Sequence, residues 1–222
     1  VELNQNNSSE LISKDEALVV SDLETIQTPP YQNIWDYIKQ NNVSQNKNIL
    51  NDQVLSYMNM HLRDLDKFND YLNDSYYFLY FVINELENSN LPLELAILPY
   101  IESNYDPFSI SSSGAVGMWQ FMPRTGRLYQ LNRSWWNEDR HDPFKSTEAA
   151  IKYLEYLYQR FDQDIYHTLA AYNAGPSLLD RRINQNKRRG LQTDFWSLNV
   201  PVQTKNYVPK FIALRELIFN SE

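Results

Sequence analysis

Hydrophobic side chains recur along most of this 222-residue chain with the spacing of helices rather than of strands. The segment from Tyr76 to Leu86 is apolar almost all round, which predicts a buried helix. An earlier apolar set falls at i, i+3, i+4, i+7, i+8 and i+11, the pattern of an amphipathic helix; its members are Val54, Tyr57, Met58, His61, Leu62 and Leu65.

Prolines mark further helix boundaries in the middle of the chain. Pro92 stands where a helix can start, and the apolar pattern of residues 93–101 continues from it. Pro99 is expected to kink or end the regular hydrogen bonding of this segment, because it lacks an amide hydrogen and its ring crowds the preceding turn. We therefore expect Glu102 to lie at a helix end and Pro123 to open another helix.

Three more helices are predicted in the C-terminal half. Ser146-Thr147-Glu148 introduces a long one, and a second over 165–173 stops at Gly175. The last, over 202–219, contains Pro209, so we expect two pieces or a kink. Since no adjacent segments alternate with period two strongly enough to predict a β-hairpin, the expected fold class is mainly α.

The chain begins with a polar stretch. Residues 1–28 are rich in Asn, Gln, Ser and acids and end at Pro29-Pro30, so we expect residues 1–30 to form a flexible polar segment. Val1 is preceded by neither an initiator Met nor a signal segment, which suggests a processed or trimmed product. No apolar run approaches the roughly 20 residues of a membrane helix, so a soluble chain is expected.

Composition and charge argue against several classes of function. The absence of Cys excludes disulfides, thiolate metal sites and a Cys nucleophile, and the net charge of −8 argues against a nucleic-acid-binding protein. The basic run 181–189 has helical spacing and is interpreted as a solvated helix face; an anionic wall polymer is the best alternative ligand. No phosphate-cradling glycine loop is present, and the histidines lie far apart, so no cofactor and no metal site are predicted; they are His61, His141 and His167.

Glu102 is the first candidate for catalysis. It ends the apolar segment 95–102, where partial removal from water would raise its pKa and let it donate a proton near neutral pH. Taken alone, the same pattern more often marks an ordinary surface or helix-end carboxylate. Asp139 and Asp142 could supply a second carboxylate for a hydrolase, but with Arg140 they are better interpreted as ion pairing at a helix start.

Two further clusters have the residue types of a carbohydrate site. The turn-prone stretch 104–117 leads into Trp119-Gln120-Phe121, which combines aromatic surface with an amide. Packing of the loop on the core through its aromatic residues is the alternative. Tyr172-Asn173 precedes Gly175 and could point into the same cleft, or could simply cap a helix.

Three ordered blocks resemble the soluble-lytic-transglycosylase domain family: 91–103, 114–123 and 170–175. Further segments, 134–136, 139–142, 193–198 and 206–210, resemble membrane-bound members of that family, and the likeness runs from about residue 31 to 219. The resemblance implies a lysozyme-like helical lobe over residues 91–222, with an N-terminal helical region over 31–90 packed on it.

The resemblance also implies an activity. It is a peptidoglycan lytic transglycosylase, a lyase that cleaves the MurNAc to GlcNAc β-1,4 bond of glycan strands without water and leaves 1,6-anhydro-MurNAc ends. Glu102 would be the single acid and base. The expected location is the periplasm or cell envelope, with membrane attachment through a lipid anchor and with LysM modules that are not in this chain. Matching positions imply that the substrate-binding residues are Ser111, which would orient Glu102, and Gln120, Met122, Tyr172 and Asn173.

Gln203 departs from the pattern of the family. Relatives commonly carry Glu in the segment 201–208 where this chain has Gln203, so we expect Gln203 to contact substrate by hydrogen bonds without charge. A muramidase that uses water is the nearest alternative function. The alternative from another functional class is a wall-binding scaffold protein that has lost its activity. The carboxylate that Gln203 replaces is the feature of the sequence that points to it.

Overall fold

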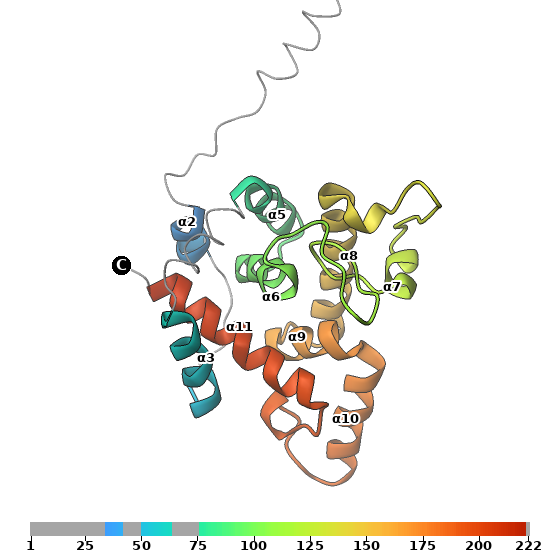
Figure 1. Ribbon diagram of the computed structural model, residues 1–222. Coiled ribbons are helices and arrows are strands. Elements are labelled where there is room, and N and C mark those ends of the chain that lie inside the picture. The colour runs from blue at the N-terminus through green and yellow to red at the C-terminus, as the bar shows by residue number, and fades with distance from the viewer. Residues whose placement is uncertain (1–33, 42–49, 64–75, 221–222) are drawn as a thin grey trace, which may run out of the picture. The chain divides into compact units, whose positions relative to one another are not determined.

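The structure is a computed structural model that describes residues 34–41, 50–63 and 76–220 (Figure 1). The described residues contain isolated β-bridges but no strand, which confirms the mainly α fold class. None of their helices is long and apolar enough to cross a membrane. The helices are α2 (Ile34–Asn41), α3 (Asp52–Leu62), α5 (Tyr76–Asn88), α6 (Leu98–Ser103), α7 (Pro123–Leu128), α8 (Pro143–Arg160), α9 (Ile165–Ala174), α10 (Pro176–Arg188) and α11 (Val202–Asn220), with 3-10 helices η1 (Leu93–Ile97), η2 (Asp139–His141) and η3 (Phe195–Ser197).

Two predictions for the N-terminal part of the chain fall wholly or partly outside the described residues. The expected flexible segment over residues 1–30 and the side chain of Leu65 are outside the described residues. The helices predicted from Val54 and from Tyr76 are confirmed as α3 and α5. The division of the chain at residues 30 and 90 stays a prediction.

Helix α11 packs against α3 and α9, and it also contacts α2, α6 and η1 (Figure 1). Its apolar side chains are buried on several sides, as Val208, Phe211 and Leu214 show. The helix continues through Pro209 as one element, so of the two expected outcomes the break into two pieces was wrong and the kink stays a prediction. We attribute this to the buried apolar contacts on both sides of Pro209, which offset the roughly 3 kcal/mol that an internal proline costs.

The segment before Glu102 changes helix type at its proline. η1 ends at Ile97, and Pro99 then occupies the first turn of α6, where its missing amide hydrogen is not needed. Pro99 therefore helps to start the α-helix rather than to end it. Glu102 lies in the last turn of α6, as expected, and Asn104 closes the helix in the left-handed conformation with φ 54°.

The long helix α8 begins earlier than Ser146-Thr147-Glu148 had indicated. Asp142 caps it by accepting hydrogen bonds from the amides of Phe144 (2.9 Å) and Lys145 (3.0 Å). Thr147 is instead buried within the helix, where its hydroxyl accepts a hydrogen bond of 2.9 Å from the indole of Trp119. The cap was misplaced because both Asp and Ser are good N-cap residues.

Arg140 joins the loop before α7 to the segment that leads into α8. Its buried guanidinium donates to the carboxylate of Glu138 and to the carbonyls of Gly114 (3.1 Å) and Phe121 (2.8 Å). A Cβ at Gly117 would lie 1.8 Å from the Arg140 carbonyl oxygen, so only glycine fits there. Asp139 pairs with Lys145 at 2.9 Å and Arg140 with Glu138, so ion pairing at the helix start is confirmed for these two residues, whereas Asp142 acts as the cap.

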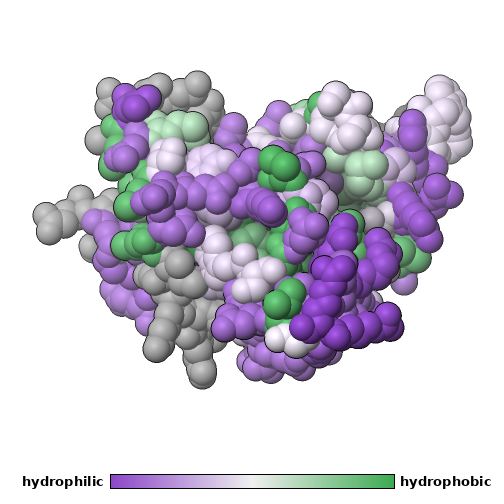
Figure 2. Space-filling view, turned by 90° about the horizontal axis from the view of Figure 1, so that it is seen from below, coloured by the Kyte–Doolittle hydropathy of each residue, from purple (hydrophilic) through white to green (hydrophobic). Residues whose placement is uncertain are grey.

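The basic run is the exposed end of α10. Arg181, Lys187, Arg188 and Arg189 are all exposed, as expected for a solvated helix face, and binding of an anionic polymer there stays the alternative. Figure 2 shows strongly hydrophilic residues gathered over this helix.

A buried ion pair ties α11 to the helix that precedes the site. Arg215 of α11 donates to the Glu94 carboxylate of η1 at 3.0 Å, and both side chains are almost fully enclosed. The Glu216 carboxylate lies 3.3 Å from the same guanidinium. A buried pair of this kind is sensitive to loss of one partner, since the remaining charge stays out of water.

Replacing Arg215 by Leu should lower the free energy of unfolding by about 3 kcal/mol, because the buried Glu94 carboxylate loses its cation. Chemical denaturation measures this change. Arg160→Leu is the matched control, since its pair with Asp180 is partly exposed and should contribute less than about 1 kcal/mol. Equal effects of the two substitutions would contradict the assignment.

Candidate active site

Four helices meet around a small open cleft. Its volume is about 220 Å³. Helix α3 contributes one side chain, α6 two, α9 one and α11 four; they are Tyr57, Ile101, Glu102, Asn173, Gln203, Asn206, Tyr207 and Lys210. The cleft therefore combines residues more than 150 positions apart in the sequence.

Glu102 is the one carboxylate among the described residues that line this cleft. Its side chain is largely enclosed, and the hydroxyl of Tyr207 donates a hydrogen bond of 2.5 Å to its Oε1. Burial raises the pKa of Glu102 to about 7, against the opposing effects of the Tyr207 hydrogen bond and the positive charge of Lys210. Near neutral pH, Glu102 therefore populates both its acid and its carboxylate form.

Two buried phenols accompany Glu102. Burial, and next the charge of Glu102, raises the pKa of both Tyr207 and Tyr172 well above the usual value, so both keep their protons. The Tyr172 hydroxyl donates to the carbonyl of Trp119 at 2.8 Å, which fixes its ring. Tyr172 thus lies close enough to Glu102 for the two to interact electrostatically, although Tyr172 does not line the cleft.

The amides in the cleft are held by hydrogen bonds between helices. The Thr204 hydroxyl of α11 donates to Oδ1 of Asn173 at 2.9 Å, and Asn173 lines the cleft. Gln53 of α3 donates to Oδ1 of Asn206 at 2.6 Å. Gln203 is exposed at the rim.

The structure thus brings together three residues that the sequence singled out, Glu102, Asn173 and Gln203, and places Tyr172 beside them. Ser111, Gln120 and Met122 do not line the cleft.

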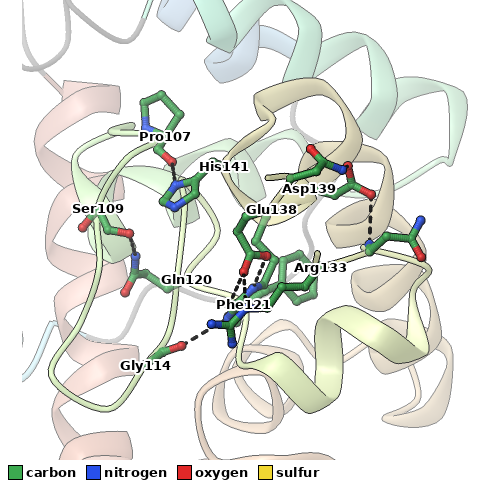
Figure 3. Close-up of polar contacts among 12 residues, drawn as sticks. Pro107, Ser109, Gly114, Gln120, Phe121, Arg133, Glu138, Asp139 and His141 are labelled. Atoms are coloured by element: carbon green, nitrogen blue, oxygen red, sulfur yellow. Dashed lines mark hydrogen bonds and ion pairs between the residues drawn. The ribbon is translucent and has the colours of Figure 1, made fainter. Parts of the chain in front are cut away.

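The loop residues use their polar groups within the loop itself. The Ser111 hydroxyl lies 3.0 Å from that of Ser113 and accepts from the Ala115 amide at 2.9 Å. Gln120 donates to the carbonyls of Gly117 (2.8 Å) and Ser109 (3.3 Å), the latter contact drawn in Figure 3. Met122 is 43% exposed. Their roles toward substrate stay predictions, and the hydroxyl that reaches Glu102 is that of Tyr207.

Sequence reasoning missed five lining residues. Tyr57 and Ile101 were taken for apolar packing positions, because they belong to the apolar stripe of α3 and to the apolar segment 93–101. The other three could have been found from their spacing: Asn206, Tyr207 and Lys210 follow Gln203 at i+3, i+4 and i+7, which places all four on one helix face.

Within the described ranges, no three His, Asp or Glu side chains gather closely enough to hold a metal ion.

Comparison with known proteins gives one family and several relatives. Residues 80–195 match the family described as Transglycosylase SLT domain. The chain is 38% identical over 172 residues to membrane-bound lytic murein transglycosylase D of Escherichia coli (strain K12), which covers 78% of this chain and 38% of that protein. It is 39% identical over 112 residues to a putative tributyltin chloride resistance protein of Alteromonas sp. (strain M-1), covering 50% of this chain and 54% of the relative.

A solved structure supports the helical fold. The lytic transglycosylase Slt from Pseudomonas aeruginosa aligns with a TM-score of 0.51 and 22% sequence identity, over 62% of this chain and 23% of that one. The present chain therefore spans well under half the length of the transglycosylases that it matches.

The raised pKa of Glu102 has a measurable consequence for stability. The unfolded-state pKa lies near 4.5 and the folded-state value near 7, so the stabilisation present below pH 4.5 is lost as the pH rises through 7. Glu102→Gln removes this dependence. The stability of the variant relative to the wild type should therefore increase between pH 5 and pH 8, by on the order of 2 kcal/mol.

Urea denaturation at the two pH values measures this difference. Glu148→Gln, the same change at an exposed position of α8, is the control and should show no such dependence on pH. A pH-independent difference for Glu102→Gln would mean that its carboxyl titrates normally in the folded protein.

Proposed function

Because the chain belongs to the Transglycosylase SLT domain family, we propose that it cleaves the β-1,4 bond between MurNAc and GlcNAc in peptidoglycan without water, leaving a 1,6-anhydro-MurNAc end. One observation carries the proposal. Glu102 is the one carboxylate among the described residues of the cleft, and its pKa of about 7 suits both halves of the reaction. The name of the E. coli relative, a lytic murein transglycosylase, supports the same chemistry.

In the first step, Glu102 is the acid. Its protonated carboxyl donates to the glycosidic oxygen as the bond to the MurNAc anomeric carbon breaks, and the GlcNAc alcohol leaves. The positive charge on the sugar needs a partner, and the sugar's own acetamido oxygen can supply it, as in substrate-assisted glycosidases. A second carboxylate is then not required.

In the second step, Glu102 is the base. Its carboxylate removes the proton from the MurNAc 6-hydroxyl, whose oxygen attacks the anomeric carbon and closes the anhydro ring. Proton and electrons balance without water, because the proton given in the first step is recovered in the second. Lys210 and the Tyr207 hydroxyl favour the carboxylate form through charge and hydrogen bonding and so keep it available between the steps.

Other carboxylates that the sequence raised as partners are unsuited to that role. Asp139 is buried in its pair with Lys145, and the hydrogen bond from Lys145 is the main cause of its low pKa of about 2. Asp142 caps α8 and does not line the cleft. This arrangement favours one-carboxylate chemistry over a muramidase with an acid and a separate base.

The remaining side chains fit binding of an amide-rich sugar. Asn173, Asn206 and Gln203 offer hydrogen-bonding groups along the cleft, and Tyr57 adds an aromatic surface. Because Gln203 is uncharged, position 203 adds no second negative charge to the cleft that contains Glu102. Ser111, Gln120, Met122 and Tyr172 complete the proposed substrate contacts, in keeping with the family resemblance.

The substrate also suggests a location. A murein-cleaving protein acts in the bacterial cell envelope, and we place the chain there, in the periplasm. We extend the proposal to membrane attachment through a lipid anchor and to LysM wall-binding repeats, both outside the residues described.

The first test of this function is release of soluble muropeptides from purified sacculi. Glu102→Gln should reduce the rate by about 10²- to 10⁴-fold, because the amide can neither give nor take the proton. Glu148→Gln should leave it unchanged. Undiminished release by the Glu102 variant would exclude the assignment, and no release by the wild type would favour the inactive scaffold.

The second test uses the pH dependence of kcat/KM. Activity should fall above about pH 7, as the acid form of Glu102 is lost. Lys210→Met removes the cation that lowers the pKa of Glu102, so the falling limb should move to higher pH. Lys205→Met, an exposed lysine on the same helix, is the control. An unmoved limb in Lys210→Met would contradict the electrostatic role of Lys210.

A further inference from the structure

Two adjacent tryptophans stand in solvent on a turn far in sequence from the cleft residues. Trp135 is 89% exposed and Trp136 is 74% exposed, and their rings meet edge to face with centroids 5.0 Å apart. Tryptophan is the residue with the largest apolar surface to lose to water, so an exposed pair usually marks a contact surface. The reaction proposed for Glu102 does not use either side chain.

The turn that carries the pair is well formed. The Ser134 amide donates to the Asn137 carbonyl at 2.7 Å, and the Ser134 hydroxyl accepts from the Asn137 amide at 3.0 Å. An antiparallel bridge between Arg133 and Glu138 closes its base. These bonds hold the two indoles at the tip of a short hairpin.

A polar recess of about 350 Å³ adjoins the base of this hairpin. It shares Arg133 and Glu138 with the hairpin, and Figure 3 shows these two side chains beside each other. Its lining residues come from α7 and the segment up to η2, and none of them lines the catalytic cleft; they are Pro123, Arg127, Leu131, Asn132, Arg133, Glu138 and Arg140.

The recess is positively charged although the chain is acidic overall. It holds three guanidinium groups and one carboxylate, and that carboxylate is already paired with Arg140 at 2.8 Å and Arg133 at 3.4 Å. Arg127 is exposed, and 69% of the Arg133 side chain is exposed. Both can therefore turn toward an incoming anion, and guanidinium groups bind carboxylates in two-pronged fashion.

We propose that the Trp135–Trp136 pair and the adjoining arginine recess form a second peptidoglycan-binding site outside the catalytic cleft. A sugar ring of the glycan strand stacks on an indole face, and a stem-peptide carboxylate enters the recess toward Arg127 and Arg133. The inference rests on the proposed function for the identity of the polymer. Such a site would hold an insoluble substrate while Glu102 acts on the strand.

The details of the surface favour a wall polymer over a lipid surface. Trp and Arg also occur together at membrane interfaces. Here, however, the apolar tip is only two residues wide, and it is flanked by Ser134 and Asn137, whose polar groups suit sugar hydroxyls. The cations lie in a concave recess rather than on a flat face, which fits a small anionic group projecting from a polymer.

The test is binding to purified sacculi, measured by co-sedimentation in the Glu102→Gln background so that the polymer stays intact. Trp135→Ala with Trp136→Ala should weaken binding about tenfold, and Arg127→Gln with Arg133→Gln should weaken it further at low salt. Thermal unfolding should hardly change with the tryptophan substitutions, because both side chains are exposed.

Matched controls separate the site from general effects. Leu191→Ala removes another exposed apolar side chain, and Lys39→Gln with Lys152→Gln removes two exposed charges from α2 and α8. Both should bind sacculi like the parent. Equal loss in the controls, or full binding by the double tryptophan variant, would overturn the proposal.

Binding to vesicles that contain anionic phospholipid is measured in parallel, for the parent and for the double tryptophan variant. Loss of vesicle binding in the tryptophan variant with unchanged sacculus binding would assign the pair to a membrane surface and overturn the inference. Muropeptide release is measured separately with Glu102 intact. If no muropeptides are released but sacculus binding still depends on the tryptophans, only the proposed catalysis is contradicted. If muropeptides are released normally but binding does not depend on the tryptophans, only the second site is contradicted.

Discussion

The enclosure of the Glu102 carboxyl between α6 and α11 is the constraint on which the rest of the site depends. Removal from water raises the pKa of this group, while the hydrogen bond from Tyr207 and the charge of Lys210 oppose the rise. Too little burial would leave a permanent carboxylate, and too much would leave a permanent acid. A balance near pH 7 is what the proposed reaction requires of a single residue that gives a proton and then takes it back.

The surrounding fold maintains that balance. Helix α11 supplies both opposing groups, and its position is tied to η1 by the buried pair of Arg215 and Glu94 and to α3 and α9 by apolar packing. The loop on the other side of α6 is anchored by Arg140, whose close approach demands Gly117. The Ser103 hydroxyl, next to Glu102, donates to the Met118 carbonyl at 2.9 Å and so joins the loop to the helix end. The residues that anchor these elements, Arg215, Arg140 and Ser103, thus lie outside the lining of the cleft.

The helical class, most helices and the position of Glu102 at a helix end could be predicted from periodicity, prolines and caps. The hydroxyl that lies beside Glu102 could not be predicted, because only tertiary packing brings Tyr207 of α11 to it. The role of Ser111 stays a prediction. Tyr57 shows the same limit: an apolar stripe predicts a buried face but not which part of it borders a cleft. The outcomes at Pro99 and Pro209 could not be fixed from sequence, because the effect of a proline depends on its position within a helix and on the surrounding packing.

The central claim is that Glu102 performs a complete cleavage without a second carboxylate and without water. It is tested most directly by digesting sacculi in water enriched in heavy oxygen and weighing the new MurNAc ends by mass spectrometry. The account predicts ends that are lighter than the reducing sugar by one water and carry no heavy oxygen. Reducing ends labelled with heavy oxygen throughout would show that water attacks the sugar, and would contradict it.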